Sequence, residues 1–286
     1  MLPRGPIVRR YARIVSADSR KRLARVVRRP DADLAEAALL CCVEAEPDLD
    51  VDVALLRLDA IADVVRTSGF VSTTAAADAA ALGAHLVGRL GFVGDRETYH
   101  DPVNALLSQV LERRRGLPIT LSILWVAIGR RLDLPIHGIG LPGHFVVGIG
   151  DGDDRVVVDP FGGGAVLDER ETAALVARAT GNRVPFRRSL LRPANTPSIV
   201  RRLLNNLTRD YQAAGDAGAA LWSVDLKLLL PAIAAEDHRA RGELLLHLGR
   251  FDEAADAFEA YLDVAESPPD GEDVRKRAIN ARARLN

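Results

Sequence analysis

The segment that most constrains the fold is long enough for a helix and apolar on nearly every side. Residues 118–134 read PITLSILWVAIGRRLDL, and Gly116, Leu117 and Pro118 break the chain just before or at its start. A helix that is apolar all round has to be buried inside a domain. The segment therefore predicts a central helix around which the other elements pack.

Two short strands are predicted directly after this helix. Residues 144–150 (HFVVGIG) and 155–161 (RVVVDPF) flank the sequence DGDD. An Asp-Gly pair favours a two-residue type I′ turn, which would place His144 directly opposite Asp159. A four-residue loop would shift the register by two and leave the two side chains as diagonal neighbours. Either turn puts an imidazole and a carboxylate on one face of a hairpin.

This pair has a known chemical use. A carboxylate that accepts one ring N–H of a histidine fixes its tautomer and leaves the other nitrogen to act as a base. The start of the central helix, packed against the hairpin, would place a nucleophile beside that base, as in papain. Its first turn carries the hydroxyls of Thr120 and Ser122. On these residues alone, His144 and Asp159 could equally form a structural hydrogen-bonded pair.

The remainder of the chain reads as mostly helical. Apolar spacing predicts helices over 33–46, 48–65 and 75–90. Asp101 before Pro102 is a good N-cap and first helical position, so one helix is expected from there to Gly116.

After residue 197 the pattern indicates paired helices. Leu248-Gly249, Phe251, Ala254 and Phe258 follow the spacing of a tetratricopeptide repeat. About two helix pairs and a last helix are too few for an independent solenoid, so they should lean on the core or bind a partner. The polar residues of 201–206, which include Arg202 and Asn206, suit either role.

Three segments together carry a resemblance to a known family. RRGLPITLS, LPGHFVV and DPFGGG resemble the transglutaminase-like core of the SirB family, and the similarity covers roughly residues 31–286. The resemblance implies an α+β fold with a helical N-terminal part, a papain/transglutaminase-like core with a small antiparallel sheet, and a C-terminal α-helical TPR-like segment. The domains expected are a basic N-terminal extension over 1–30, the transglutaminase-like domain over 31–190 and the helical domain over 191–286.

The resemblance also assigns candidate site residues. His144 and Asp159 match the histidine and aspartate of the transglutaminase triad. Enzymes of this type carry Gly-x-Cys at the start of the central helix, whereas this chain reads Gly116-Leu117-Pro118. Proline has no nucleophilic atom, and the nearest candidate substitutes are Thr120 and Ser122, although a hydroxyl is a far weaker nucleophile than a thiolate.

Neither of the two cysteines is predicted to supply the missing nucleophile. Cys41 and Cys42 are adjacent in sequence, so they form no disulfide framework, and they lie on a different predicted helix. We expect them to be small core residues. The missing thiol favours a degenerate, non-catalytic core over an active enzyme.

The distribution of charge along the chain bears on which binding partners are possible. The net charge of −1 divides into +9 over residues 1–30 and −10 over the remainder. The preferred interpretation is that this arm is solvated or pairs with the acidic body, and contact with nucleic acid is the alternative. The longest apolar run is too short for membrane insertion, no export signal is evident, and the cysteine usage suits the cytoplasm.

No cofactor and no metal are expected. Gly162, Gly163 and Gly164 lack the lysine and spacing of a phosphate-binding loop, and the six histidines show no ligand spacing. The sequence thus predicts a transglutaminase-like protein that recognises a protein or peptide and has a regulatory role. The alternative is a cleft hydrolase or acyl-transferase that acts on amide or ester bonds through His144, Asp159 and a hydroxyl or activated water.

Overall fold

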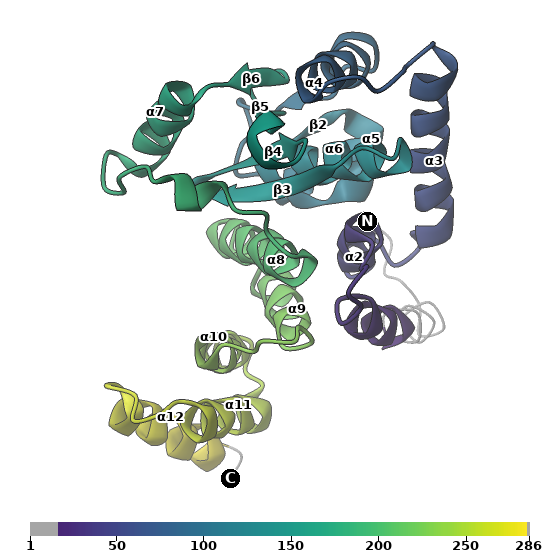
Figure 1. Ribbon diagram of the computed structural model, residues 1–286. Helices are drawn as coiled ribbons and strands as arrows, with labels where there is room; N and C mark the ends of the chain where they lie inside the picture. The colour runs from purple at the N-terminus through teal and green to yellow at the C-terminus, as the bar shows by residue number, and fades with distance from the viewer. Residues whose placement is uncertain (1–16, 285–286) are drawn as a thin grey trace.

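The computed structural model describes residues 17–284, which form N-terminal helices, a core with a sheet, and a C-terminal run of helices (Figure 1). The N-terminal part consists of a helix over 17–26, α2 (Leu34–Cys42), α3 (Val51–Thr67), α4 (Ala75–Gly83) and the π-helical turn η1 (Ala84–Arg89). The three predicted helices of this region are therefore present, and the third ends in a π-helical turn.

The core follows as α5 (Leu107–Arg113), α6 (Pro118–Arg131), β3 (Ile136–Leu141), β4 (His144–Ile149), β5 (Val156–Asp159), β6 (Ala165–Leu167) and α7 (Glu169–Thr180). The strands form an antiparallel sheet in the order β3-β4-β5-β6. A second, very short parallel pair joins β1 (Val93–Gly94) to β2 (Arg115–Gly116). The α+β class with a small antiparallel sheet is confirmed.

Helix α6 is the central helix that the sequence predicts. Every residue from Pro118 to Gly129 is buried, and Trp125 is fully enclosed. The helix packs against β3 and β4 of the sheet on one side and against α2 and α3 on others. The start of α6 and the start of β4 line one small cavity, so they lie close together.

The predicted two-residue turn between β4 and β5 is wrong. Ile149 pairs with Val156, so residues 150–155 connect the strands through a 3₁₀ turn, η3 (Gly152–Asp154). A type I′ turn needs positive φ at both central residues, but Asp151 is extended at φ −118°. The register is that of the longer-loop alternative, which makes His144 and Asp159 diagonal neighbours on one face.

The single helix expected after Asp101 is also wrong. Asp101 does cap a helical turn and accepts from the amide of Val103 at 3.1 Å, but that turn is the 3₁₀ segment η2 (Pro102–Ala105). Leu106 is extended (φ −93°, ψ 114°), which interrupts the helix before α5 begins.

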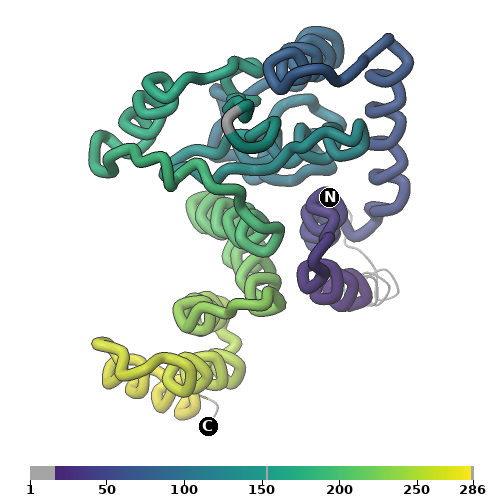
Figure 2. The backbone as a smooth tube through the Cα atoms, in the orientation of Figure 1, coloured from purple at the N-terminus to yellow at the C-terminus, as the bar shows by residue number. Residues whose placement is uncertain are grey.

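The C-terminal part consists of the 3₁₀ turn η4 (Arg188–Leu191) and then α8 (Thr196–Ala213), α9 (Ala217–Lys227), α10 (Ala235–His247), α11 (Phe251–Val264) and α12 (Gly271–Ala283). Figure 2 follows the chain from the sheet into α8 and on through the stacked helices. One side of α8 joins the same apolar core as α6, through Ile199, Val200, Leu203, Leu204 and Leu207. Helices α9 to α12 form most of a second apolar cluster, and Tyr211 packs against both.

The described part of the basic arm is packed helix. Leu23 is fully buried, Arg20 pairs with Glu44 at 2.6 Å, and Arg22 pairs with Glu36 at 2.7 Å. The interpretation that these cations pair with the protein's own acids is confirmed for both arginines. Residues 1–16 of the predicted extension lie outside the described residues. Across 17–284, no helix combines the length and the apolar character needed to cross a bilayer.

Candidate functional site

A small cavity opens where the start of α6, the start of β4 and one face of α8 meet. Its volume is about 100 Å³, and we call it the His144 cavity. The residues that line it are Tyr99, Pro118, Ile119, Gly143, His144, Phe145, Arg202, Asn206 and Arg209. The cavity therefore contains His144 and Pro118, the residue that the family resemblance sets against the cysteine of the enzymes.

The side chains of His144 and Asp159 are joined directly. His144 Nε2 lies 2.9 Å from Asp159 Oδ1, and the two residues are only 9% and 7% exposed. The same Oδ1 accepts from the amide of Phe161 at 3.1 Å. A side chain at Gly162 would place its Cβ 2.6 Å from Asp159 Oδ2, so the glycine lets the turn close over the carboxylate. With Nε2 on Asp159, Nδ1 is the ring nitrogen left for another partner.

Neither hydroxyl of the first turns of α6 is aimed at His144. Thr120 Oγ1 is fully buried, donates to the carbonyl of Asn104 at 2.7 Å and accepts from the amide of Leu117 at 2.9 Å. Ser122 Oγ lies 3.4 Å from the carbonyl of Phe145. Thr120 thus closes the N-terminal turn of α6, and its proposed role as nucleophile stays a prediction.

The cysteines lie in α2, away from the residues that line the His144 cavity. Both are fully buried, with their sulfurs 3.3 Å from the carbonyls of Ala37 and Ala38. Burial raises the pKa of Cys41 well above its usual value and that of Cys42 to about 11. Because the thiolate is the nucleophilic form, both thiols are held in the inert form.

Helix α8 contributes three cavity residues, of which the sequence analysis gave Arg202 and Asn206 a role in packing or partner binding and gave Arg209 none. Arg202, Asn206 and Arg209 stand at i, i+4 and i+7, which places them on one face of the helix. That spacing predicts a shared polar face on the helix, but nothing in the sequence shows that this face contacts β4. Tyr99 also lines the cavity and was not singled out.

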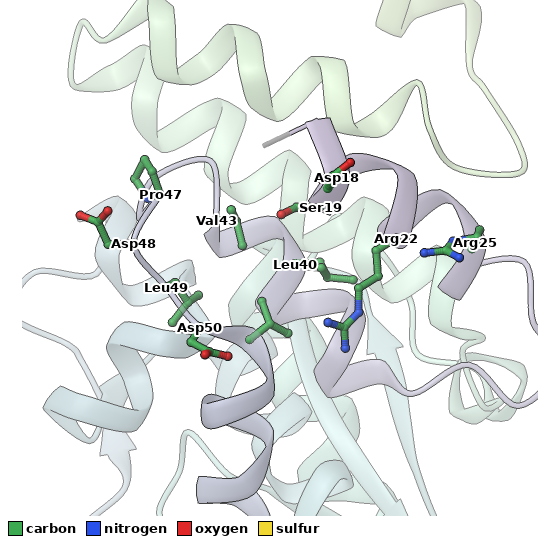
Figure 3. Close-up of a pocket in the computed structure, with 11 residues that line it drawn as sticks. Asp18, Ser19, Arg22, Arg25, Leu40, Val43, Pro47, Asp48, Leu49 and Asp50 are labelled. Carbon is green, nitrogen blue, oxygen red and sulfur yellow. The ribbon is translucent and has the colours of Figure 1, made fainter. Parts of the chain in front are cut away.

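A larger groove of about 570 Å³ lies between the first helix, α2 and the loop before α3. Figure 3 shows Arg22 on one side of it and Asp48 and Asp50 on the other. Arg22 is already paired, at 2.7 Å each, with Glu36 and Asp52. The groove holds none of the candidate catalytic residues, so the smaller His144 cavity is the candidate site.

We found no place in residues 17–284 where three or more histidine, cysteine, aspartate or glutamate side chains gather to hold a metal ion.

Two family models match the chain. The transglutaminase-like superfamily matches residues 53–205, and a tetratricopeptide repeat model matches residues 207–279. The first match runs from α3 into α8 and includes every residue that lines the His144 cavity except Asn206 and Arg209.

Curated relatives extend this picture. A UPF0162 protein of Xylella fastidiosa (strain 9a5c) is 32% identical over 86% of this chain and 89% of its own length. A UPF0162 protein of Pseudomonas aeruginosa is 33% identical over 75% of this chain and 78% of its own. F-box only protein 21 of Homo sapiens is 28% identical over 57% of this chain and 27% of its own. No solved structure was found to match the chain. Since the Xylella match extends over most of both chains and the core model over α3 to α8, the chain belongs to the transglutaminase-like superfamily as a UPF0162 protein with a tetratricopeptide segment.

Proposed function

We propose that this protein is a cytoplasmic, SirB-type recognition module with a regulatory role, in which a transglutaminase-like cleft without a nucleophile binds a peptide segment of a protein partner. One observation carries the proposal: Pro118 lines the cavity beside His144. The residue at the start of α6 faces the histidine but offers no atom that could attack a carbonyl carbon. The tetratricopeptide helices continue directly from α8, so they supply a second surface for the same partner.

The intact His144–Asp159 pair favours one alternative. A histidine oriented by a buried carboxylate can deprotonate a bound water as well as a side chain. The competing function is therefore a hydrolase or acyl-transferase that acts on amide or ester bonds with water or Thr120 as nucleophile. Thr120 would first have to release its hydrogen bond to Asn104.

Activity-based labelling separates the two functions. Full-length wild type, His144→Ala and Pro118→Cys would be treated with amide- and ester-based probes and with a thiol-directed probe. We expect wild type and His144→Ala to label equally, and Pro118→Cys to gain thiol labelling that disappears when His144 is also replaced. Labelling of wild type that depends on His144 would refute the non-catalytic cleft.

Peptide selection tests recognition directly. A displayed random peptide library would be selected on the immobilised full chain, and binding of the enriched peptides measured by fluorescence polarisation. Asn206→Trp should fill the His144 cavity and weaken binding at least tenfold, whereas Asn205→Trp, next to it but outside the cavity, should not. Circular dichroism would confirm that both variants fold. The proposal fails if no peptide is enriched, or if the enriched peptides bind both variants equally.

A further inference from the structure

The His144 cavity contains a cation with no acidic partner. Arg202 Nη2 donates to the carbonyl of His144 at 2.5 Å, and its guanidinium carbon lies 5.4 Å from the centre of the Phe145 ring. A Cβ at Gly140 would come within 3.3 Å of Arg202 Nη1, so the glycine in β3 leaves room for the guanidinium. Among the side chains that the structure describes, no carboxylate forms an ion pair with Arg202.

Such a cation is costly to bury. Arg202 is half-buried, and burial lowers the pKa of its guanidinium, although arginine remains charged at neutral pH. A charge removed from water without a counter-ion is unfavourable, and an anion that enters the cavity would compensate it. The groove of Figure 3 differs in this respect, because Arg22 there already has two carboxylate partners.

The charges around the cavity fit an anion with a single charge. Arg209 is neutralised by a bidentate contact with Asp210, at 2.8 and 2.9 Å. His144 is paired with Asp159, so these two residues together add no net positive charge. Arg202 is therefore the cation of the cavity to which these contacts supply no carboxylate. A carboxylate matches it, whereas a phosphate monoester would bring about −1.5 to −2 charges.

The size and polarity of the cavity agree with this assignment. A volume of about 100 Å³ would hold roughly three water molecules at the ~30 Å³ that each occupies in the liquid. A carboxylate with the carbon that carries it fits that space. Asn206 and Tyr99 add polar groups beside Arg202, and guanidinium groups suit the planar carboxylate.

We propose that the His144 cavity binds a carboxylate of the partner peptide, held by the Arg202 guanidinium with Asn206 and Tyr99 beside it. The proposal rests on the proposed function, because it names the peptide group that the cleft recognises. The carboxylate can come from the C-terminus of the partner or from an Asp or Glu side chain. A binding cleft would thus occupy the site at which related enzymes carry out acyl transfer.

The test uses the full chain and the peptides enriched by selection. Each peptide would be synthesised with a free C-terminus, with an amidated C-terminus, and with each Asp or Glu replaced by Asn or Gln. Affinities would be measured for wild type, Arg202→Gln, Arg202→Lys and the control Arg201→Gln. Arg201 is the neighbouring cation on α8, but it pairs with Asp237 and does not line the cavity.

We expect Arg202→Gln to weaken binding tenfold to a hundredfold, as is typical for loss of a charged hydrogen bond. Arg202→Lys should weaken it less, and Arg201→Gln less than threefold. A matching loss on amidation assigns the carboxylate to the chain end, and a loss on Asp or Glu replacement assigns it to a side chain. If Arg202→Gln fails to fold, these changes in the peptide still test the proposal on wild type.

Three results would overturn the proposal. Peptides that lose affinity for Asn206→Trp but are insensitive to Arg202→Gln, amidation and acid replacement would refute the carboxylate and leave the recognition cleft standing. Inorganic phosphate that competes better than acetate would refute the single-charge argument. Selection that enriches no peptide would remove the proposed function together with this inference.

Discussion

Glycine in a helix is normally replaced by alanine with a gain in stability, but Gly242 in α10 should show the opposite. A Cβ at Gly242 would lie 2.6 Å from Cε1 and 2.7 Å from Cδ1 of Phe258, the fully buried ring of α11. Carbon atoms pack best at about 3.5–4.0 Å, so the methyl group overlaps the ring by about 1 Å. The ring sits among buried neighbours of the second apolar cluster and has little room to retreat.

Two opposing effects set the magnitude of the Gly242→Ala change. Helix propensity favours alanine by about 1 kcal/mol. Overpacking of a well-packed core costs about 1–3 kcal/mol, and contact with several ring atoms argues for the upper part of that range. We therefore expect Gly242→Ala to lower the free energy of unfolding by about 1–2 kcal/mol.

Urea unfolding followed by circular dichroism measures this change. Gly218→Ala in α9 is the matched control, since its Cβ would meet only Asp216 Oδ1, at an ordinary 3.5 Å, and it should be neutral or slightly stabilising. Phe258→Leu should destabilise the protein by itself but remove most of the Gly242→Ala penalty in a double-mutant cycle. If Gly242→Ala stabilises the protein as much as Gly218→Ala does, the close contact between α10 and the ring is refuted.

Three further outcomes follow from the site and its surroundings. Cys41 and Cys42 should react with a disulfide reagent at pH 8 only when the protein is unfolded, and prompt labelling of the folded protein would contradict their burial. Because the pKa of Cys42 is raised to about 11 in the folded protein, the urea midpoint should also fall as the pH rises from about 9 to 11. Thr120→Val should lower the free energy of unfolding by about 1–2 kcal/mol, and Thr120→Ser by less, because the buried hydroxyl caps α6. A Thr120→Val protein that unfolds thermally at the wild-type temperature would contradict this role. Asp159→Ala should cost about 1–3 kcal/mol, because it leaves Nε2 of buried His144 without its hydrogen-bond partner. Asp159→Asn keeps an acceptor and should cost clearly less, and equal losses in urea unfolding would argue against the hydrogen bond.

The elements that sequence reasoning placed correctly depend on local chemistry. The all-apolar face of α6 could only be buried, and the alternation of β4 and β5 kept His144 and Asp159 on one face whichever turn joined them. The turn itself was misjudged because Gly150, at φ +90°, begins the loop one residue before the Asp-Gly pair. Turn conformation depends on a few dihedral angles that neighbouring residues can shift.

The cavity could not be foreseen because it depends on contacts between distant segments. Arg202 and Tyr99 come from opposite sides of the core sequence and reach the cavity only when α8 docks beside β4. Hydrophobic spacing indicates which face of α8 is buried, but it does not identify the element that packs beside the neighbouring polar residues Arg202 and Asn206. For the same reason, the sequence made Thr120 a nucleophile candidate, whereas its hydroxyl donates to Asn104, which precedes it by sixteen residues.

The packing of the first helix has a consequence for synthesis of the chain. Arg28 donates to the carbonyl of Leu229, 201 residues later, and Leu23 shares an apolar cluster with Leu226 and Leu230. At about 5–20 residues per second, a ribosome needs roughly 10–40 s to deliver the second half of that contact. Until then the apolar face of the first helix has no native cover on that side. The first helix can therefore complete its packing only after residues 226–230 have emerged.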